Sequence, residues 1–487
     1  MSLNLHDPTL LRTQALIGGQ WVDGQNGSTI EVYDPGNGEC VAKVAQSGAS
    51  ETQRAIDAAE EAFKTWRHVP AKKRGALLRR WFELMMEAQE DLACILTAEM
   101  GKVLPEARGE IAYGASFLEW FSEESKRVYG DVIPPPSNDQ RIVVIKQPVG
   151  VVACITPWNF PNAMLTRKIS PALAAGCTVV CKPASSTPLS ALAIGELAQR
   201  AGIPDGVVNM VVGSSREIGP VLTQSSVVRK LTFTGSTPVG KQLVEDCAGT
   251  LKKVSMELGG NAPFIVFEDA DLEAAIEGAM ASKYRNSGQT CVCTNRFFVQ
   301  DSIYDQFTEQ LKQAVRKLKL GYGFDEGVTT GPLINRQAVE DVEKRVQASV
   351  AQGATVALGG QRSSLGDCFY EPTVMIDVKN DMPVAKEEIF GPVAPIIRFQ
   401  TEEQVVQMAN ETTVGLAAYL YTRDLGRSWR VSEALEYGMV GINEGIVSNE
   451  AAPFGGVKES GFGREGSKYG TDDYLEIKYL CMGGIES

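Results

Sequence analysis

Strand-like and helix-like segments alternate over residues 149–267, and this alternation constrains the fold more than any other feature of the sequence. The expected strands occupy residues 149–155, 178–182, 207–212, 229–233 and 253–257, and the expected helices occupy residues 166–175, 189–201 and 239–248. Such a series predicts a mostly parallel sheet covered by helices. Ligands bind these sheets at the carboxyl ends of the strands, which are followed here by Asn159, Lys182 to Ser185, Gly235, Ser236 and Glu257.

A second α/β series follows from residue 262 to about residue 424, with expected strands at 296–299 and 393–398 and a helix at 304–317. The chain has 487 residues, more than one hydrophobic core supports, so two or three domains are expected. A site built from loops of both series would lie between two domains, which is a common place for a substrate cleft.

The residues before the first series predict a hairpin followed by helices. The hairpin covers residues 16–34 and turns at Gly18 and Gly19. Apolar residues at helical spacing predict helices at 51–66, with Ser50 as a cap, and at 71–100 and 107–129, after which a β-rich segment covers residues 141–147.

The charge balance argues against two classes of partner. Lys and Arg total 47 against 60 Asp and Glu, and the net charge of −13 does not suit a nucleic-acid or anionic membrane surface. The N-terminus lacks the regions of a secretion signal, and no apolar run approaches the ~20 residues that span a bilayer. We therefore expect a cytoplasmic protein with no nucleic-acid and no membrane partner.

Cysteine and histidine usage narrows the chemistry. The ten cysteines are irregularly spaced, which predicts reduced thiols rather than a disulfide framework. Cys177 and Cys181 are spaced like metal ligands, but no second Cys or His pair follows, so no metal site is predicted. The two histidines are His6 and His68, and nothing around His68 suggests a Ser-His-Asp or Cys-His hydrolase site.

Cys291 is the candidate nucleophile. It ends the small polar segment Asn-Ser-Gly-Gln-Thr-Cys (286–291), which follows a helix-like run at 270–284 and the cation Arg285. A thiolate is a strong nucleophile where it is partly exposed near positive groups. Taken alone, Cys291 is as well explained as a small packed hydrophobic residue.

Three motifs resemble the aldehyde dehydrogenase superfamily and occur in its order and spacing: Pro-Trp-Asn-Phe-Pro (157–161), Met-Glu-Leu-Gly-Gly-Asn (256–261) and the segment that ends at Cys291. The resemblance covers residues from about 15 to 480. It is closest to the succinate-semialdehyde dehydrogenase branch, particularly the bacterial enzymes that use NADP.

The resemblance implies an α/β fold with two open twisted-sheet domains and a small β arm. A Rossmann-type cofactor domain would cover residues 1–128 and 148–261, and a catalytic domain residues 262–473. The arm, residues 129–147 and 474–487, would join copies of the chain into a homo-oligomer, either a dimer or a tetramer.

The resemblance also assigns catalytic roles. Cys291 would attack an aldehyde carbonyl, Asn159 and the Cys291 backbone amide would donate to the oxyanion, and Glu257 would be the base for hydrolysis of the thioester. Glu257 ends an apolar strand segment, so desolvation is expected to raise its pKa toward neutrality. Without the motifs, Asn159 is also explained as a turn residue and Glu257 as a surface carboxylate.

No Gly-x-Gly-x-x-Gly fingerprint is present, but Gly235-Ser-Thr-Pro-Val-Gly240 keeps the strand, the glycine and the helix start. Its helix N-terminus could hold a pyrophosphate, although a capped Gly-Ser turn explains it equally well. NADP is the favoured cofactor, with NAD possible, because relatives that prefer NAD often carry a glutamate where Ser185 stands. The residues implied to bind the cofactor are Trp158, Lys182, Ser185, Gly235, Ser236, Leu258 and Glu388.

For the substrate, Arg167, Arg285 and Ser448 match residues that hold the carboxylate of succinate semialdehyde in the resembled branch. Either arginine alone is also explained by an ordinary ion pair. Oxidation of succinate semialdehyde to succinate, in the degradation of γ-aminobutyrate, is therefore the first interpretation. The alternative is a dehydrogenase that acts on glutarate semialdehyde or on another small aldehyde, such as an aminoaldehyde. Two interpretations come from other protein classes: a thiol hydrolase, or a nucleotide-binding protein without turnover. Cys293 is either a bystander or the partner of Cys291 in a reversible disulfide.

Overall fold

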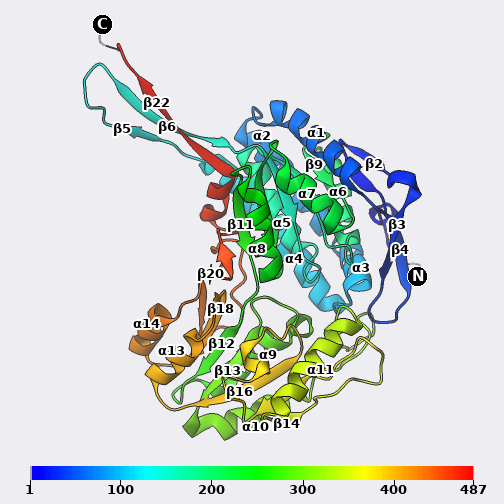
Figure 1. Ribbon diagram of the computed structural model, residues 1–487, viewed down its shortest axis with the longest axis vertical. Helices are drawn as coiled ribbons and strands as arrows, with labels where there is room; N and C mark the ends of the chain where they lie inside the picture. Colours follow the sequence, from blue (N-terminus) through cyan, green and yellow to red (C-terminus); the bar gives the residue numbers. More distant parts are fainter. Residues whose placement is uncertain (1–2, 486–487) are drawn as a thin grey trace.

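The computed structural model describes residues 3–485 and has a body built on two sheets, from which a narrow arm projects (Figure 1). The first sheet has the strand order β2-β1-β9-β8-β7-β10-β11-β21. Its strands are β1 (Ala15–Ile17), β2 (Gln20–Val22), β7 (Val151–Ile155), β8 (Thr178–Lys182), β9 (Val208–Met210), β10 (Val228–Thr234), β11 (Lys253–Glu257) and β21 (Gly461–Phe462). The five strands from β9 to β11 run parallel, which confirms the predicted parallel sheet.

Helices cover both faces of this sheet, and two predictions about them were wrong. The segment expected as one helix over residues 71–100 is two helices, because Ala88 leaves helical geometry at φ −98° and ψ 13°. No helix was expected at α7, where an internal Gly219 and Pro220 obscure the pattern. The helices are α1 (Ala49–Trp66), α2 (Ala71–Glu87), α3 (Gln89–Met100), α4 (Leu104–Glu124), α5 (Ala163–Ala175), α6 (Leu189–Arg200), α7 (Ser215–Gln224) and α8 (Thr237–Ala248).

The ends of several elements also differ from the prediction. Helix α1 begins at Ala49 with Gly48 as its N-cap, rather than after Ser50. Helix α4 begins three residues before the expected position and ends at Glu124, followed by the 3-10 turn Ser125–Arg127. The predicted hairpin forms between β1 and β2, and its turn uses Gly18 and Gly19 at φ 59° and 80°, where glycine carries no steric penalty.

The second sheet has the order β14-β15-β16-β13-β12-β18-β19 and is parallel except where β14 joins β15. Its strands are β12 (Ala262–Val266), β13 (Thr294–Gln300), β14 (Thr355–Leu358), β15 (Thr373–Ile376), β16 (Val393–Phe399), β18 (Ala417–Tyr421) and β19 (Met439–Ile442). Its helices are α9 (Leu272–Tyr284), α10 (Tyr304–Val315), α11 (Arg336–Val350), α12 (Pro383–Lys386), α13 (Glu402–Asn410) and α14 (Leu425–Ala434).

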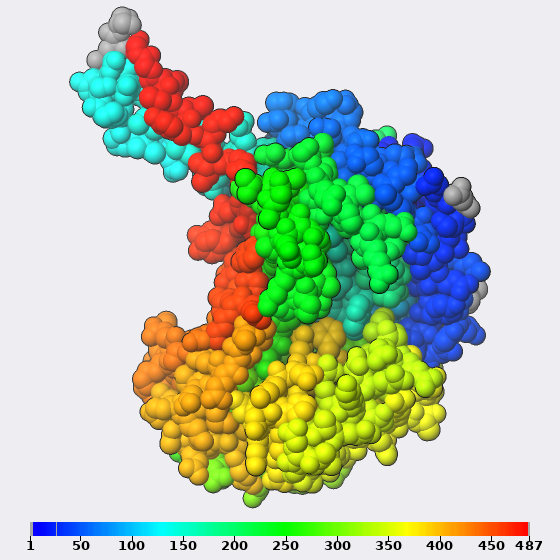
Figure 2. All heavy atoms as spheres, viewed as in Figure 1, coloured from blue at the N-terminus to red at the C-terminus, as the bar shows by residue number. Residues whose placement is uncertain are grey.

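Three smaller sheets complete the fold. In the arm, β6 (Arg141–Pro148) lies between β5 (Asp131–Ile133) and β22 (Leu475–Met482), all antiparallel, and Figure 2 shows the arm standing clear of the body. The other two are the pairs β3 (Thr29–Tyr33) with β4 (Cys40–Ala45) and β17 (Val414–Gly415) with β20 (Val457–Lys458). None of the helices within residues 3–485 has the length and apolar character needed to cross a membrane.

The chain passes between the two sheets more than once, and this places the candidate site. Strand β21 pairs with β11 in the first sheet, so the segment around residue 461 returns to the first domain although residues up to 473 were assigned to the second. The 3-10 helix Arg285–Gly288 links α9 to the turn that carries Cys291, just before β13. The carboxyl ends of β7, β10 and β11 therefore lie near a loop of the second domain.

Candidate active site

Cys291 lies at the junction of two cavities and is half-buried. The loop that carries Cys291 packs tightly on the 256–261 motif. A Cβ added at Gly260 of that motif would lie only 2.7 Å from the Cys291 carbonyl oxygen. Only glycine permits that approach without a shift of the backbone. Met164 of α5 borders both cavities beside Cys291.

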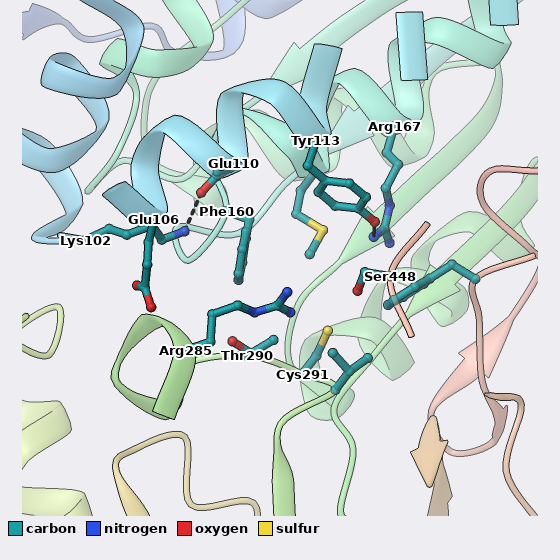
Figure 3. Close-up of a pocket in the computed structure, with 14 residues that line it drawn as sticks. Lys102, Glu106, Glu110, Tyr113, Phe160, Arg167, Arg285, Thr290, Cys291 and Ser448 are labelled. Atoms are coloured by element: carbon teal, nitrogen blue, oxygen red, sulfur yellow. Dashed lines mark hydrogen bonds and ion pairs between the residues drawn. The ribbon is translucent and has the colours of Figure 1, made fainter. Parts of the chain in front are cut away.

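The first cavity, which we name the arginine cavity, has a volume of about 280 Å³. All three residues predicted to hold the substrate carboxylate, Arg167, Arg285 and Ser448, border it, and Figure 3 shows them around the Cys291 sulfur. Its other lining residues are Lys102, Glu106, Gly109, Glu110, Tyr113, Phe160, Met164, Thr290, Val292 and Phe454.

The two arginines of this cavity have different electrostatic environments. The Arg167 side chain is 1% exposed, and its Nε donates to Glu465 Oε2 at 2.7 Å. Lys168 Nζ lies 2.5 Å from the other Glu465 oxygen, and although burial acts to raise the pKa of Glu465, Lys168 and Arg167 hold it at about 2. Arg285 is half-buried, lies 5.6 Å from the centre of the Phe160 ring, and has no carboxylate partner within residues 3–485. Arg285 therefore forms no ion pair among the described residues, although its charge acts on the buried Glu106 carboxylate of the same cavity.

The second cavity, the carboxylate cavity, has a volume of about 240 Å³ and contains Glu257 and Glu388. Five of the seven residues predicted to bind the cofactor border it. The lining residues are Pro157, Trp158, Asn159, Met164, Thr234, Gly235, Ser236, Glu257, Leu258, Gly259, Cys291, Glu388 and Phe390.

Both carboxylates of this cavity are buried. Burial raises the pKa of Glu257, and the charge of Glu465 raises it further. Glu257 Oε2 has no hydrogen-bond partner within the described chain, so it is available to accept a proton. Burial also raises the pKa of Glu388 to about 7, and one of its oxygens accepts from the Gly260 backbone at 3.2 Å.

The carboxylate cavity fits a nicotinamide dinucleotide. Helix α8 begins beside it at Ser236, whose side chain caps no backbone N–H, so the helix N-terminus is free to bind a phosphate. The Thr234 hydroxyl is buried there without a partner among the described residues, and Trp158 and Phe390 meet edge to face at 5.5 Å to form an aromatic wall. Glu388 would accept from hydroxyl groups of the cofactor.

Lys182 and Ser185, the remaining predicted cofactor residues, lie outside the lining of this cavity. Lys182 ends β8 and is buried, which lowers the pKa of its ammonium group, and its recorded contact is the Pro183 carbonyl at 3.5 Å. The Ser185 hydroxyl donates to the Gly213 carbonyl at 3.0 Å. Lys182 is thus the last residue of a strand of the first sheet, and Ser185 follows that strand.

Asn159 is placed to serve as an oxyanion donor. It is 3% exposed, borders the carboxylate cavity with Cys291, and its Nδ2 donates one hydrogen bond to Gln289 at 3.0 Å. The amide has a second N–H, and no acceptor is recorded for the Cys291 backbone N–H within residues 3–485. The oxygen atom of a carbonyl group attacked by Cys291 could accept hydrogen bonds from both of these N–H groups.

The two cysteines of the motif lie in different surroundings. Burial raises the pKa of the Cys291 thiol to about 12, which is opposite to the low pKa that a redox sensor needs. Cys293 is buried, borders neither cavity, and its Sγ donates to the Lys283 carbonyl at 3.2 Å. The cysteines are free thiols, and the predicted Cys291–Cys293 bond stays a hypothesis.

Sequence reasoning missed the acidic and cationic side chains that α4 and its preceding loop bring to the arginine cavity. Glu110 was absorbed into the predicted amphipathic helix at 107–129, whereas Lys102 and Glu106 lay in the gap between two predicted helices. The available signal was the pair of acids at i and i+4 beside apolar positions, which places both on one helix face. Within residues 3–485 no cluster of three or more His, Cys, Asp or Glu side chains is arranged to hold a metal ion.

Comparison with known proteins agrees with this geometry. The family model described as "Aldehyde dehydrogenase family" matches residues 21–480. A glutarate-semialdehyde dehydrogenase of Pseudomonas aeruginosa is 61% identical over 99% of this chain and 100% of its own length. A succinate-semialdehyde dehydrogenase [NADP(+)], GabD, of Escherichia coli is 60% identical with the same coverage. The crystal structure of succinate-semialdehyde dehydrogenase from Burkholderia pseudomallei is similar with a TM-score of 0.98 and 60% identity, covering 99% of this chain and 100% of that one.

Cys291 lies between the arginine cavity and the carboxylate cavity, an arrangement that suits an oxidoreductase acting on aldehydes. The chain belongs to the aldehyde dehydrogenase family. This confirms the predicted resemblance and the two-domain α/β fold, and it makes the protein an aldehyde dehydrogenase of the group that uses NAD or NADP.

Proposed function

We propose that the protein oxidises succinate semialdehyde to succinate. The observation that carries this proposal is Arg285, a guanidinium that forms no ion pair with a carboxylate within residues 3–485 and that borders the same cavity as Cys291. A substrate with an aldehyde at one end and a carboxylate at the other would place the carboxylate on Arg285 and the carbonyl at Cys291. Ser448 adds a hydroxyl donor to the same cavity.

The first chemical step follows from the protonation of the site. The Cys291 thiol transfers its proton to Glu257 and its sulfur bonds to the aldehyde carbon, forming a thiohemiacetal. Asn159 Nδ2 and the Cys291 backbone N–H donate to the oxyanion, and one such donor is typically worth ~10²- to 10³-fold in rate. A bound nicotinamide supplies the acceptor for the hydride of that carbon.

Hydrolysis then releases the acid. Oxidation at the carbon leaves a thioester on Cys291. Glu257 releases the proton of the thiol to solvent and then removes a proton from the water that attacks the thioester. The carbon–sulfur bond breaks, succinate leaves, and the sulfur regains a proton. Burial and the charge of Glu465 raise the pKa of Glu257, which makes it a stronger base than a solvated carboxylate.

Glutarate semialdehyde is the second candidate substrate, because a relative with that name shares 61% of the sequence. The two substrates differ by one methylene, which is worth only ~1 to 3 kcal/mol in binding discrimination. Both place a carboxylate at the far end from the aldehyde, so Arg285 serves either one.

We infer NADP as the preferred cofactor, with NAD accepted more slowly. Lys182 is a buried cation with no carboxylate partner within residues 3–485, and Ser185 beside it leaves no negative charge to repel a 2′-phosphate. The similar enzyme from E. coli carries NADP in its name.

We also infer a cytoplasmic homo-oligomer, a dimer or tetramer built through the arm. Strands β5 and β22 are open edges, and Val132, Ile477 and Tyr479 are 80%, 73% and 60% exposed. Exposed apolar edge strands pair with other chains. Light scattering on the 52.6-kDa chain should give twice or four times its mass, and a monomer at micromolar concentration would contradict the inference.

The direct test of function is the initial rate of NADP and NAD reduction with succinate semialdehyde, glutarate semialdehyde and betaine aldehyde. We expect rapid NADP reduction with the two acidic aldehydes, and none with a Cys291→Ala control. A preference for betaine aldehyde would contradict the carboxylate-binding role of Arg285.

A further inference from the structure

Three charged side chains next to the arginine cavity have no role in the mechanism above. Lys102 precedes α4, and Glu106 and Glu110 lie one turn apart on its first two turns. The side chains of Lys102 and Glu110 are each 1% exposed, and Figure 3 shows their ion pair beside Phe160. Burial of charged groups is costly unless they are paired, so their contacts show what they hold in place.

The Lys102–Glu110 pair fixes the backbone on both sides of Phe160. Lys102 Nζ donates to the Asn159 carbonyl at 3.1 Å. Glu110 Oε1 accepts from the backbone N–H groups of Asn162 and Ala163 at 3.0 and 3.2 Å. These N–H groups begin α5, whose N-cap residue makes no side-chain cap of its own. The pair therefore holds the loop that carries the oxyanion donor.

Glu106 holds the other half of the oxyanion site. Its two oxygens accept from the Asn286 backbone N–H at 3.0 and 3.2 Å. Asn286 and Ser287 have positive φ angles of 52° and 55°, a conformation that few non-glycine residues adopt and that needs support from its surroundings. This is the loop that leads to Cys291.

The two halves meet at Asn159. Its carbonyl accepts from Lys102 and also from Asn286 Nδ2, each at 3.1 Å. Asn286 Nδ2 and Asn159 Nδ2 both donate to the Gln289 carbonyl, at 3.1 and 3.0 Å. The charged face of α4 is thus connected to the oxyanion donor and to the loop of the nucleophile through one hydrogen-bond network.

We propose that Lys102, Glu106 and Glu110 are positioning residues that hold the Asn159 amide against the Cys291 loop and so assemble the oxyanion hole. This inference rests on the oxyanion role of Asn159 in the proposed function. Small displacements of reacting groups are costly, since a 1 Å misplacement can lower the rate ~10²-fold. The residues act through Asn159 and not by contact with the aldehyde carbon.

A double-mutant cycle with Asn159 tests this inference. The double variant Lys102→Met/Glu110→Gln removes both charges and keeps their approximate volume, whereas either single change would strand a buried charge. We expect kcat for succinate semialdehyde to fall about 10- to 100-fold, with the KM for NADP within about twofold. In an Asn159→Ala background the same double change should lower kcat by less than about threefold, because the group that it positions is absent.

Two controls separate positioning from general damage. Arg108→Met/Glu90→Gln removes a bidentate ion pair of α4 that is 42% and 44% exposed, and this variant should keep wild-type kcat. Alkylation of Cys291 by neutral iodoacetamide needs no oxyanion hole, so its rate in Lys102→Met/Glu110→Gln should stay within about twofold of wild type. If that double variant does not fold, Glu106→Gln, which keeps its shape, is carried through the same cycle with an expected tenfold loss of kcat.

The outcomes are distinct. Equal losses of kcat in the wild-type and Asn159→Ala backgrounds would show that the charged residues act elsewhere, which would overturn the positioning role and leave the proposed function intact. If Asn159→Ala itself keeps kcat, the oxyanion role in the proposed function fails and the positioning role fails with it.

Discussion

The two cavities that meet at Cys291 differ in how their charges are balanced. The arginine cavity is bordered by two cations that form ion pairs, Arg167 with Glu465 and Lys102 with Glu110, and by Arg285, which forms no ion pair within residues 3–485. The carboxylate cavity contains two buried acids, Glu257 and Glu388, whose pKa values are raised by burial even though cations such as Arg167 and Lys283 act to lower them. An unpaired cation suits recognition of an anion, whereas a buried acid suits proton uptake and hydrogen bonding to hydroxyls. The difference divides the work of the site into substrate selection on one side and proton and cofactor chemistry on the other.

The largest effect is expected from substitution of Cys291, the nucleophile that borders both cavities. Cys291→Ala should lower kcat by at least about 10⁴-fold, because no other nucleophile of the described chain borders both cavities. The dissociation constant for NADP, measured by fluorescence quenching, should stay within about twofold, since the other walls of the carboxylate cavity are unchanged. A large loss of NADP affinity would mean that the two cavities are not separable.

Glu257→Gln tests the proton chemistry of the carboxylate cavity. Steady-state turnover should fall about 10²- to 10⁴-fold, the range of a general base. Glu257 acts as a base in both chemical steps, so in rapid-mixing experiments the first equivalent of NADPH per subunit should form more slowly than in the wild type, and later turnover should also be slow. Full turnover in this variant would assign the base to another group.

Ser185→Glu tests which residues set the preference for NADP over NAD. A carboxylate beside Lys182 would pair with the cation and oppose a 2′-phosphate, so kcat/KM for NADP relative to NAD should fall about 10- to 100-fold. Ser185→Ala is the matched control and should change this ratio by less than about threefold. An unchanged ratio in Ser185→Glu would place the 2′-phosphate elsewhere.

The smallest expected effect is the dependence of the rate of thioester hydrolysis on pH. Glu257 must be ionised to accept a proton, and its pKa is raised by burial and by Glu465, so the rate of thioester hydrolysis should rise with pH through a midpoint above the ordinary carboxyl range. The Glu257→Gln variant should lose this acid limb in single-turnover hydrolysis. A wild-type midpoint at the ordinary value of a solvated glutamate would contradict the burial argument.

The strand ends and the nucleophile could be predicted from the sequence because they depend on local pattern. Apolar runs of strand length, each followed by a polar or glycine-containing turn, located Asn159, Gly235 and Glu257 at one edge of a parallel sheet. The motifs placed Cys291 beside them, and the two cavities bring these residues together. Periodicity is a reliable guide when the interaction lies within one element.

The charge balance could not be predicted in this way, because it depends on contacts between distant segments. Arg167 meets Glu465 across 298 positions, and Lys102 reaches Asn159 across 57. A sequence pattern shows that a residue is charged and not which charge faces it. The split of the 71–100 helix at Ala88 was missed for a related reason, since alanine favours helix and carries no local signal for a break.

The most direct test of the account is the selectivity of Arg285→Met, measured as kcat/KM for succinate semialdehyde and for butanal, a neutral aldehyde of the same chain length. We predict a loss of about 10²-fold for succinate semialdehyde and less than about threefold for butanal, because only the former needs the unpaired guanidinium. Equal losses for the two aldehydes, or no loss for either, would contradict the claim that this cavity selects an acidic aldehyde through Arg285.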